Sequence, residues 1–364
     1  MDFDLTEEQQ LLRDVTRDVL SRHDGGTRTG DEPGWSREVW GQLAEVGILG
    51  LGFDPTEAGQ IEAMVVLTEI GRRLAPEPVA AAALIPGGLI AELGSDRQKE
   101  ILESVAAGEK LLAFAHTERG ARVASAEPAA RAAQDGDTWT LSGQKNPVLA
   151  GDCADTVVAT ATLPGGGVGL FLVDGEAVAR HPYRMFDGRR GAQLDFDSTP
   201  AEPLGEGGDA TEHVARAVIR FQSALCAEAV GAMEEALRLT TEYLTSRKQF
   251  GVPLSKFQTL TQRAADMYVS LELARSMNFY AAMSIADDRF DPVIAARAKL
   301  QIGRSGRHIA QEAIQLHGGI GMTAEYPVGH YAARLTAIDN TFGTTDDQLR
   351  TLIPHVGDYG TVSL

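Results

Sequence analysis

Two segments of this sequence place side chains that could hold a phosphate next to glycines. In the first, 241–251 (TEYLTSRKQFG), Arg247 follows a run with helical periodicity, and Gly251 comes shortly after it. A guanidinium offers a planar fork of donors that suits a pyrophosphate, and glycine often terminates a helix in the left-handed conformation. An arginine at a helix end can also simply offset the helix dipole, a use that is about three times more frequent. This segment alone therefore does not establish a binding site.

The second segment, 311–322 (QEAIQLHGGIGM), ends another expected helix. Gln315 lies on that helix, and Gly318, Gly319 and Gly321 follow it. Glycines leave room where a cofactor must approach the backbone closely. The alternative is an ordinary glycine-rich helix end, and a GGxG pattern is weak evidence by itself. No GxGxxG follows a strand, so a nicotinamide dinucleotide site has little support.

Composition and charge disfavour several other classes of function. The 364-residue chain is 43% hydrophobic and 23% charged, which is ample for two or three structural units. Its net charge of −18, without a run of Lys or Arg, disfavours a nucleic-acid partner. The two cysteines are too few for a disulfide framework. The sequence has no CxxC and no HExxH pattern, so we expect no metal site. With no apolar stretch of about 18 residues and no signal-peptide pattern, we expect a cytoplasmic protein without membrane contact.

Periodicity predicts an α+β fold in three segments. These are an N-terminal α-helical domain at 1–110, a middle antiparallel β domain at 111–205 and a C-terminal α-helical bundle at 206–364. The β segment alternates short β-rich runs with turn dipeptides. The expected strands are 111–117, 138–145, 155–163, 168–174 and 192–198. The expected C-terminal helices are 210–246, 255–286, 291–316, 325–338 and 344–354.

The residues that follow the first segment extend its pattern. SRKQFG and the next stretch, VPLSKFQTLTQRAADM (252–267), together resemble the RxQFG region of the acyl-CoA dehydrogenase family. QLHGGIGM, AFAHTE (113–118) and DGDTWTLSGQK (135–145) resemble further segments of that family, so the resemblance covers nearly the whole chain. It implies the acyl-CoA dehydrogenase fold and FAD as the cofactor.

The resemblance also implies which residues meet FAD. In the family, the RxQFG segment contacts the dinucleotide from one side, and the Gln and Gly-Gly segment contacts the FAD pyrophosphate of the neighbouring subunit. A site shared in this way implies at least a dimer. The strand matched by AFAHTE and the loop KNPVLA (145–150) supply positions that face the flavin. The implied cofactor-binding residues are Arg247, Gln249, Phe250, Phe257, Gln315, Gly318, Gly319, Thr117 and Leu149.

The implied reaction is α,β-desaturation of an acyl-CoA thioester to a 2-enoyl-CoA, with electrons passing to an electron-transfer flavoprotein. A carboxylate base and the flavin must lie on opposite faces of the acyl chain. CAEAVGAMEEAL (226–237) and IDNTFGTTDDQL (338–349) are most similar to the small subunits of bacterial two-subunit enzymes. Those enzymes degrade dicarboxylates, aromatic compounds or sterol side chains.

The sequence departs from the family pattern where the chemistry occurs. The Ser, Trp and Thr that the family keeps near the flavin are replaced by Val123, Pro147 and Leu149. The catalytic Glu of the YEGT-like segment is replaced by Phe342. The alternative position for the base, on the helix before RxQFG, is Phe221. Neither phenylalanine can accept a proton.

Two nearby carboxylates could act as the base instead. Glu228 lies two helical turns after Phe221 in an apolar run, where burial would raise its pKa toward a useful range. Asp339 lies one turn before Phe342. A structural role is the alternative for both, about twice as frequent for Glu228, because structural ion pairs also perturb carboxylates.

Several hypotheses therefore stay open. The chain could be catalytic alone, using Glu228 or Asp339, or it could be the base-lacking partner of an α2β2 complex with a second acyl-CoA dehydrogenase subunit. The simultaneous loss of Ser, Trp, Thr and Glu favours the second version. The same fold could also serve a flavin-dependent monooxygenase or a catalytically inactive structural subunit.

Overall fold

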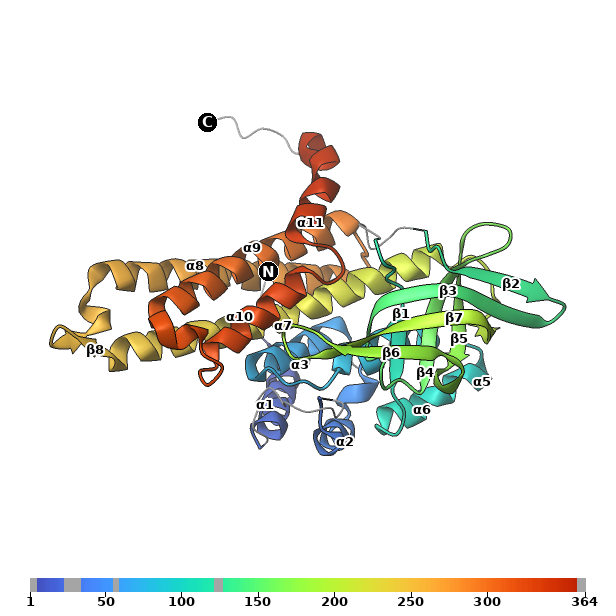
Figure 1. The fold of residues 1–364 in the computed structure, drawn as a ribbon, viewed down its shortest axis with the longest axis horizontal. Coiled ribbons are helices and arrows are strands. Elements are labelled where there is room, and N and C mark those ends of the chain that lie inside the picture. The colour runs from blue at the N-terminus through green and yellow to red at the C-terminus, as the bar shows by residue number, and fades with distance from the viewer. Residues whose placement is uncertain (1–4, 23–33, 55–58, 121–126, 359–364) are drawn as a thin grey trace. The chain divides into compact units, whose positions relative to one another are not determined.

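A computed structural model describes residues 5–22, 34–54, 59–120 and 127–358 (Figure 1). The chain separates into two compact units. One unit comprises Met1–Gln10, Met64–Ala75 and Gln222–Leu364, and the other comprises Leu11–Ala63 and Pro76–Phe221. The predicted order of an N-terminal helical region, a β region and a helical bundle is confirmed. The boundaries proposed for three domains stay a prediction.

The N-terminal region is helical, as its periodicity predicts. Its elements are α1 (Glu7–Ser21), α2 (Arg37–Glu45), α3 (Gln60–Arg73), a π-helical turn (Ala80–Leu84), α4 (Ile85–Leu93), α5 (Asp96–Lys99) and α6 (Ile101–Ala106). Pro86 explains the irregular start of α4, since it has no N–H to donate to the preceding turn. The π-helical turn is built from buried alanines and packs on the first strand of the sheet.

The middle region forms one seven-stranded sheet. Its strands are β1 (Leu112–Ala115), β2 (Arg131–Asp135), β3 (Thr138–Leu149), β4 (Thr156–Thr162), β5 (Val168–Asp174), β6 (Ala179–Arg184) and β7 (Arg190–Pro203). The order is β1-β4-β2-β3-β7-β5, with β6 paired to β7. A core of alanine, valine, leucine and phenylalanine side chains, which includes Phe171, lies within this region.

The sheet corrects the sequence prediction in two respects. It is mixed, because β1 runs parallel to β4, with Leu112 opposite Thr156, and β2 also meets β4 in parallel. In addition, β2 and β6 were not predicted. Strand β2 is mostly exposed and poor in β-branched residues, and β6 contains Pro182, which is tolerated on an edge strand but weakens the strand signal.

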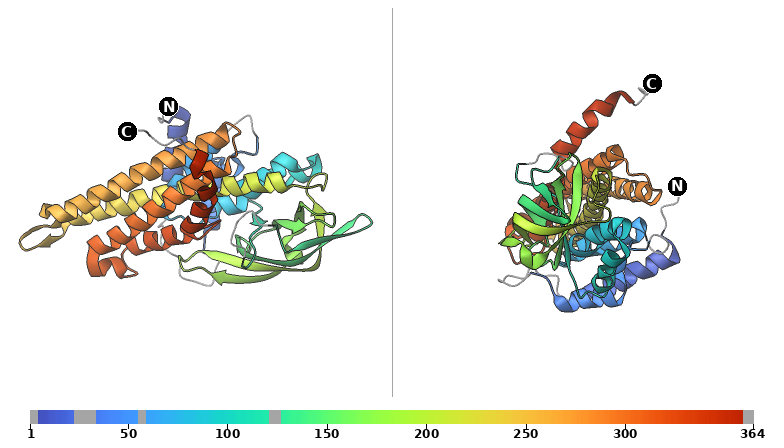
Figure 2. Two further views of the ribbon diagram at one scale, coloured as in Figure 1. Left: turned by 90° about the horizontal axis from the view of Figure 1, so that it is seen from above. Right: turned by 90° about the vertical axis from the view of Figure 1, so that its right-hand side faces the viewer.

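The C-terminal helices follow the prediction to within a few residues. They are α7 (Thr211–Ser246), α8 (Gln258–Ala286), α9 (Pro292–His317), α10 (Val328–Asp339) and α11 (Thr345–Leu352), and Figure 2 shows their course in two further views. Between α7 and α8 lie two short strands, β8 (Lys248–Gln249) and β9 (Val252–Pro253). Helix α9 starts at an N-cap: the Asp291 carboxylate accepts the N–H groups of Val293 and Ile294, and Pro292 occupies the first turn.

Two glycines let the backbones of α3 and α7 touch. A Cβ atom on Gly71 would lie far inside van der Waals contact with the carbonyl oxygen of Glu228. A Cβ atom on Gly231 would collide in the same way with the carbonyl oxygen of Thr68. Backbone on both sides leaves no flexible group that could move aside, so the crossing requires glycine at both positions.

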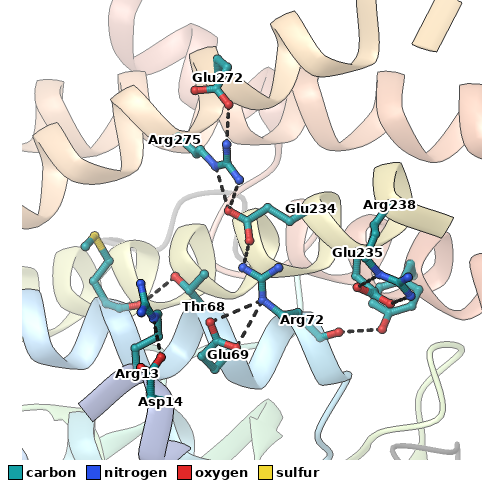
Figure 3. A network of polar contacts seen from close by, with 12 residues as sticks. Arg13, Asp14, Thr68, Glu69, Arg72, Glu234, Glu235, Arg238, Glu272 and Arg275 are labelled. Atoms are coloured by element: carbon teal, nitrogen blue, oxygen red, sulfur yellow. Dashed lines mark hydrogen bonds and ion pairs between the residues drawn. The ribbon is translucent and has the colours of Figure 1, made fainter. Parts of the chain in front are cut away.

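An alternating chain of charges surrounds this crossing (Figure 3). Arg72 on α3 pairs with Glu69 and with Glu234 on α7, and Glu234 also pairs with Arg275 on α8. Arg275 in turn binds Glu272. Glu69 is buried and the Glu234 side chain is only 9% exposed, and each faces a guanidinium, which offsets the cost of removing the carboxylates from water.

We expect Gly231→Ala to lower the free energy of unfolding by about 1–3 kcal/mol, because an added methyl group must push α3 and α7 apart. Chemical denaturation with a constant m-value would measure the loss. Gly88→Ala is the matched control, since Gly88 also lies in a helix but has open space where the methyl group would go. Alanine there should be neutral or stabilise by about 0.5–1 kcal/mol. Equal effects at the two positions would contradict the close crossing.

Candidate functional site

The segment around Arg247 is a hairpin and does not end the helix in the predicted way. Helix α7 ends at Ser246, and β8 pairs with β9 across a two-residue turn of Phe250 and Gly251. Both turn residues have positive φ, 52° and 83°, which matches the twist of tight hairpin turns. Gly251 is therefore a turn residue five positions beyond the helix, and its prediction as the helix terminator is wrong.

The hairpin carries its side chains outward. All five residues from Arg247 to Gly251 are exposed, and the Phe250 ring is 92% accessible. Phe257 meets the Phe250 ring edge-on, at 6.2 Å between centroids. Within the described part of the chain, no carboxylate pairs with the Arg247 guanidinium. An exposed cation beside an exposed aromatic ring is well suited to a ligand with both a phosphate and a planar ring.

The segment around Gln315 exposes backbone. Helix α9 ends at His317, and Gly318, with φ of 65°, caps it through its N–H group. A Cβ atom at Gly318 or Gly319 would meet nothing within 4 Å, so the bare backbone faces open space. The Gln315 side chain is exposed on the preceding turn. A phosphate needs amide donors that it can approach, and the Gln315 side chain offers one, while the Gly318 N–H group is already used by the helix cap.

Three aromatic rings bring these two segments together. The ring centroids of Tyr243 on α7 and His317 on α9 are 4.6 Å apart. Tyr326 lies 4.8 Å from His317 and 6.2 Å from Tyr243. The sequence pattern did not indicate this cluster, although Tyr243 and His317 lie inside the segments 241–251 and 311–322. The predicted residues Arg247, Gln249, Phe250 and Phe257 therefore share one end of the helical unit with Gln315, Gly318 and Gly319.

At this end of the helical unit, side chains must provide the attraction for an anionic dinucleotide, because the helix dipoles oppose it. Both α7 and α9 present their C-terminal ends, which carry partial negative charge. In a chain of net charge −18, a pyrophosphate there needs a fixed cation and amide donors. Arg247 and the side-chain amides of Gln249 and Gln315 supply them, and the lack of a side chain at Gly318 and Gly319 leaves room for close approach. The donor set is therefore compatible with the FAD pyrophosphate.

Glu228, the first candidate base, lies in a buried ion pair. Its two carboxylate oxygens accept hydrogen bonds from Nε and Nη2 of Arg334 at 2.8 and 2.7 Å. Both side chains are buried, at 7% and 6% exposure. Taking up a proton would leave the Arg334 charge buried without its partner, which is costly in a dry interior. The geometry is that of a structural pair joining α7 to α10.

Asp339, the second candidate base, ends α10 and holds the start of α11. Its Oδ1 accepts hydrogen bonds from the Thr345 N–H group at 3.1 Å and from the Thr345 hydroxyl at 2.6 Å. Its Oδ2 lies 3.4 Å from a guanidinium nitrogen of Arg307. Gly303 on α9 leaves the space for this arrangement, because a Cβ atom there would collide with both Asp339 and Thr345. Here too the carboxylate serves the fold.

The backbone around Phe342 is held firmly although no acid is present. Phe342 has φ of 53°, and its carbonyl accepts hydrogen bonds from the side-chain amides of Gln222 at 2.9 Å and Gln348 at 3.4 Å. On either side, Lys299 Nζ donates to the carbonyls of Ile338 at 2.7 Å and Gly343 at 3.2 Å. Lys299 is fully buried, and burial lowers its pKa. Lys299 was not predicted as a site residue, although a lysine on the apolar face of α9 was a signal for it.

The flavin-facing candidates Thr117 and Leu149 belong to the other unit. Thr117 follows β1, and its carbonyl accepts the Asn146 N–H group at 2.8 Å. Leu149 ends β3, opposite Gly191 of β7. Phe221 is buried in this unit as well. Val123 lies outside the described residues.

A buried lysine anchors the Thr117 segment. Lys145 Nζ donates to the carboxylate of Glu118 at 2.7 Å and to the Thr160 hydroxyl at 3.0 Å. Burial lowers the pKa of Lys145 to about 8, against the effect of the Glu118 carboxylate, which raises it. Glu118 also accepts the backbone N–H groups of Ala129 and Ala130. One carboxylate thus ties together strands β1 and β3 and the approach to β2.

Two further classes of site are unsupported within the described ranges. Across residues 5–22, 34–54, 59–120 and 127–358, no three His, Cys, Asp or Glu side chains are grouped so that they could hold a metal ion. No helix in those ranges is long and apolar enough to span a bilayer.

Comparison with known proteins agrees with this geometry. Residues 6–109 match the model of the acyl-CoA dehydrogenase N-terminal domain, and residues 217–356 match that of the C-terminal domain. The acyl-CoA dehydrogenase IpdE2 of Mycobacterium tuberculosis is 30% identical over 341 residues, 90% of this chain and 91% of the relative. A short-chain-specific acyl-CoA dehydrogenase of Clostridium acetobutylicum is 28% identical, over 90% of this chain and 92% of its own. A solved variant of the Tcur3481–Tcur3483 steroid ACAD superposes with a TM-score of 0.88 at 29% identity, covering 97% of this chain and 98% of its own.

We expect Arg334→Met to lower the free energy of unfolding by about 3–5 kcal/mol, because it leaves the Glu228 carboxylate buried and uncompensated. Adding Glu228→Gln should recover a large part of that loss, since the stranded charge is then removed. Denaturant unfolding of both single variants and of the double variant forms the cycle that measures this coupling. Additive losses would show that the two side chains do not form a coupled pair.

Proposed function

Since the chain belongs to the acyl-CoA dehydrogenase family, we propose that it is a base-lacking subunit of a heteromeric acyl-CoA dehydrogenase. Members of this family are FAD-dependent oxidoreductases that act on CH–CH bonds. In this proposal the chain supplies FAD-holding segments, and a second acyl-CoA dehydrogenase subunit supplies the carboxylate that removes the α-proton. The substrate is an acyl-CoA thioester, which is desaturated to the 2-enoyl-CoA.

The observation that carries the proposal is the use of both candidate carboxylates by the fold. Glu228 is paired with Arg334, and Asp339 is bonded to Thr345. A general base must be free to gain a proton and must lie within hydrogen-bond reach of it. Phe221 and Phe342, at the two positions where the family keeps its base, have no proton acceptor in their side chains. A base from a partner subunit accounts for all four positions.

When bound, FAD accepts the hydride of the β-carbon. The residues of this chain have separate roles in holding it. Arg247 offsets the charge of the pyrophosphate, Gln249 and Gln315 donate hydrogen bonds to it, and Gly318 and Gly319 leave room for its close approach. Phe250 and Phe257 cover apolar parts of the dinucleotide. The exposure of this surface supports its use toward a cofactor shared with a second chain.

The residue types at the flavin-facing positions also support a base-lacking subunit. Pro147 and Leu149 replace the Trp and Thr of the family pattern, so hydrogen-bond donors are missing there as well as the base. Stabilisation of developing charge by such donors is a large part of catalysis. A chain that lacks both contributions is better suited to completing another chain's site than to running its own.

The substrate class and the electron acceptor complete the proposal. The similar solved protein is described as a steroid ACAD, and its name joins two designations; both features support a bulky acyl group and a two-subunit assembly. As in the family, electrons would leave the reduced cofactor for an electron-transfer flavoprotein.

A partner-dependence experiment tests the proposal. The chain purified alone should show no bleaching of the flavin band when acyl-CoA thioesters of different size are added without oxygen. Co-purified with a second chain of the family, it should be bleached by at least one of them. Stoichiometric FAD that is reduced by an acyl-CoA in the chain alone would overturn the proposal. FAD that is reduced by NAD(P)H and then consumes oxygen would instead indicate a monooxygenase.

Arg247→Met should weaken FAD binding about 10- to 100-fold, because it removes a charge-assisted contact worth about 1.5–3 kcal/mol. Thermal stability of the FAD-free protein should not change, since the side chain is exposed. Quenching of flavin fluorescence on titration gives the affinity. Arg131→Met is the matched control, as Arg131 is an exposed arginine on β2. If Arg131→Met weakened FAD binding equally, the loss seen with Arg247→Met would reflect only the change in net charge and not a contact of Arg247 with FAD.

A further inference from the structure

We propose that Tyr243, His317 and Tyr326 form a three-ring positioning element that sets the distance between the two FAD-holding segments. This inference rests on the function proposed above and adds residues to it that do not themselves contact the cofactor. It assigns to the ring cluster the alignment of the Arg247 hairpin with the Gly318–Gly319 backbone.

The hairpin has little burial of its own to fix its place. Residues 247–251 are all exposed, so the last turn of α7 determines their position. In that turn the Tyr243 carbonyl accepts the Arg247 N–H group at 2.8 Å. The Tyr243 ring is half-buried and packs 4.6 Å from the His317 ring. A shift of Tyr243 therefore moves Arg247 directly.

The glycine segment is tied to the same rings. His317 is the residue before Gly318, and a Cβ atom on Gly321 would lie 3.0 Å from the His317 Cβ, so the glycine turn folds back tightly on His317. Tyr326, just beyond this turn, closes the cluster at 4.8 Å from His317. One buried ring thus contacts a tyrosine from α7 and a tyrosine from the segment that follows the glycines.

His317 is suited to this central place because it is uncharged there. Its Nδ1 donates a hydrogen bond to the Ala313 carbonyl at 2.7 Å, which fixes the orientation of the ring. Burial lowers its pKa, so at neutral pH the ring carries no charge that would need solvation. Tilted aromatic pairs at these separations are favourable beyond the area that they bury.

Tyr243→Ala and Tyr326→Ala should each weaken FAD binding about 2- to 10-fold, the loss of one or two ring contacts. Tyr243→Phe and Tyr326→Phe keep the rings and should bind FAD as the parent protein does. The affinity is measured by flavin fluorescence on the chain together with its partner subunit, or on the chain alone if it retains FAD. Ile302→Val, a buried change elsewhere on α9, is the control for lost stability: it should lower the melting temperature without changing the FAD affinity.

A double-variant cycle separates positioning from packing. If Tyr243 acts through Arg247, the Tyr243→Ala and Arg247→Met double variant should bind FAD no more weakly than Arg247→Met alone, within about twofold. If the double variant binds FAD more weakly by the product of the two single effects, the positioning role is overturned. An alanine variant that melts at a lower temperature but binds FAD with the parent affinity would overturn it as well. A parent complex that binds no FAD at all would overturn the proposed function, and this inference with it.

Discussion

The buried ion pair between Glu228 and Arg334 is the interaction on which the C-terminal unit depends. It joins the middle of α7 to α10 with two hydrogen bonds, one turn away from the Gly231 position where α7 touches the backbone of α3. Neither charge can leave its partner without large cost, because both are shielded from water. Helix α10 is thereby fixed, and with it Asp339, the Phe342 loop and the start of α11.

The Phe342 loop shows how much of an active-site framework can persist without its acid. The buried ammonium of Lys299 gathers carbonyls from both sides of the loop, and two glutamine amides hold the Phe342 carbonyl. These contacts involve backbone atoms, so they are independent of the side chain at position 342. The fold can therefore be retained while the chemistry of that position changes, and this physical separation makes a division of labour between two subunits possible.

At the FAD-holding end, by contrast, binding depends on particular side chains and not on the framework of the fold. Two helices converge there with their C-terminal ends, which repel an anion. Whether a dinucleotide can bind is then decided by a few exposed side chains and by glycine backbone, above all Arg247 and the Gly318–Gly319 pair. The same exposed donors explain why this end is suited to a cofactor shared across a subunit boundary.

The sequence by itself determined the features that depend on local pattern. The course of α7 was predicted at 210–246 and lies at Thr211–Ser246, because helical periodicity and turn residues act over a few positions. The two glycine-flanked segments and the missing acid at Phe342 were also legible, since they are matters of residue type and spacing.

Only the tertiary structure decided which residues meet across long separations. Arg334 lies 106 positions from Glu228, and no local signal pairs them. The same holds for the parallel pairing of β1 with β4 and for the ring cluster around His317. The hairpin turn at Phe250 and Gly251 escaped prediction because a glycine after a helix fits two backbone solutions, and the pairing of β8 with β9 selects between them. The partners of the two candidate carboxylates also became visible only in the fold: Arg334 of α10 binds Glu228 of α7, and Arg307 of α9 lies near Asp339 at the end of α10.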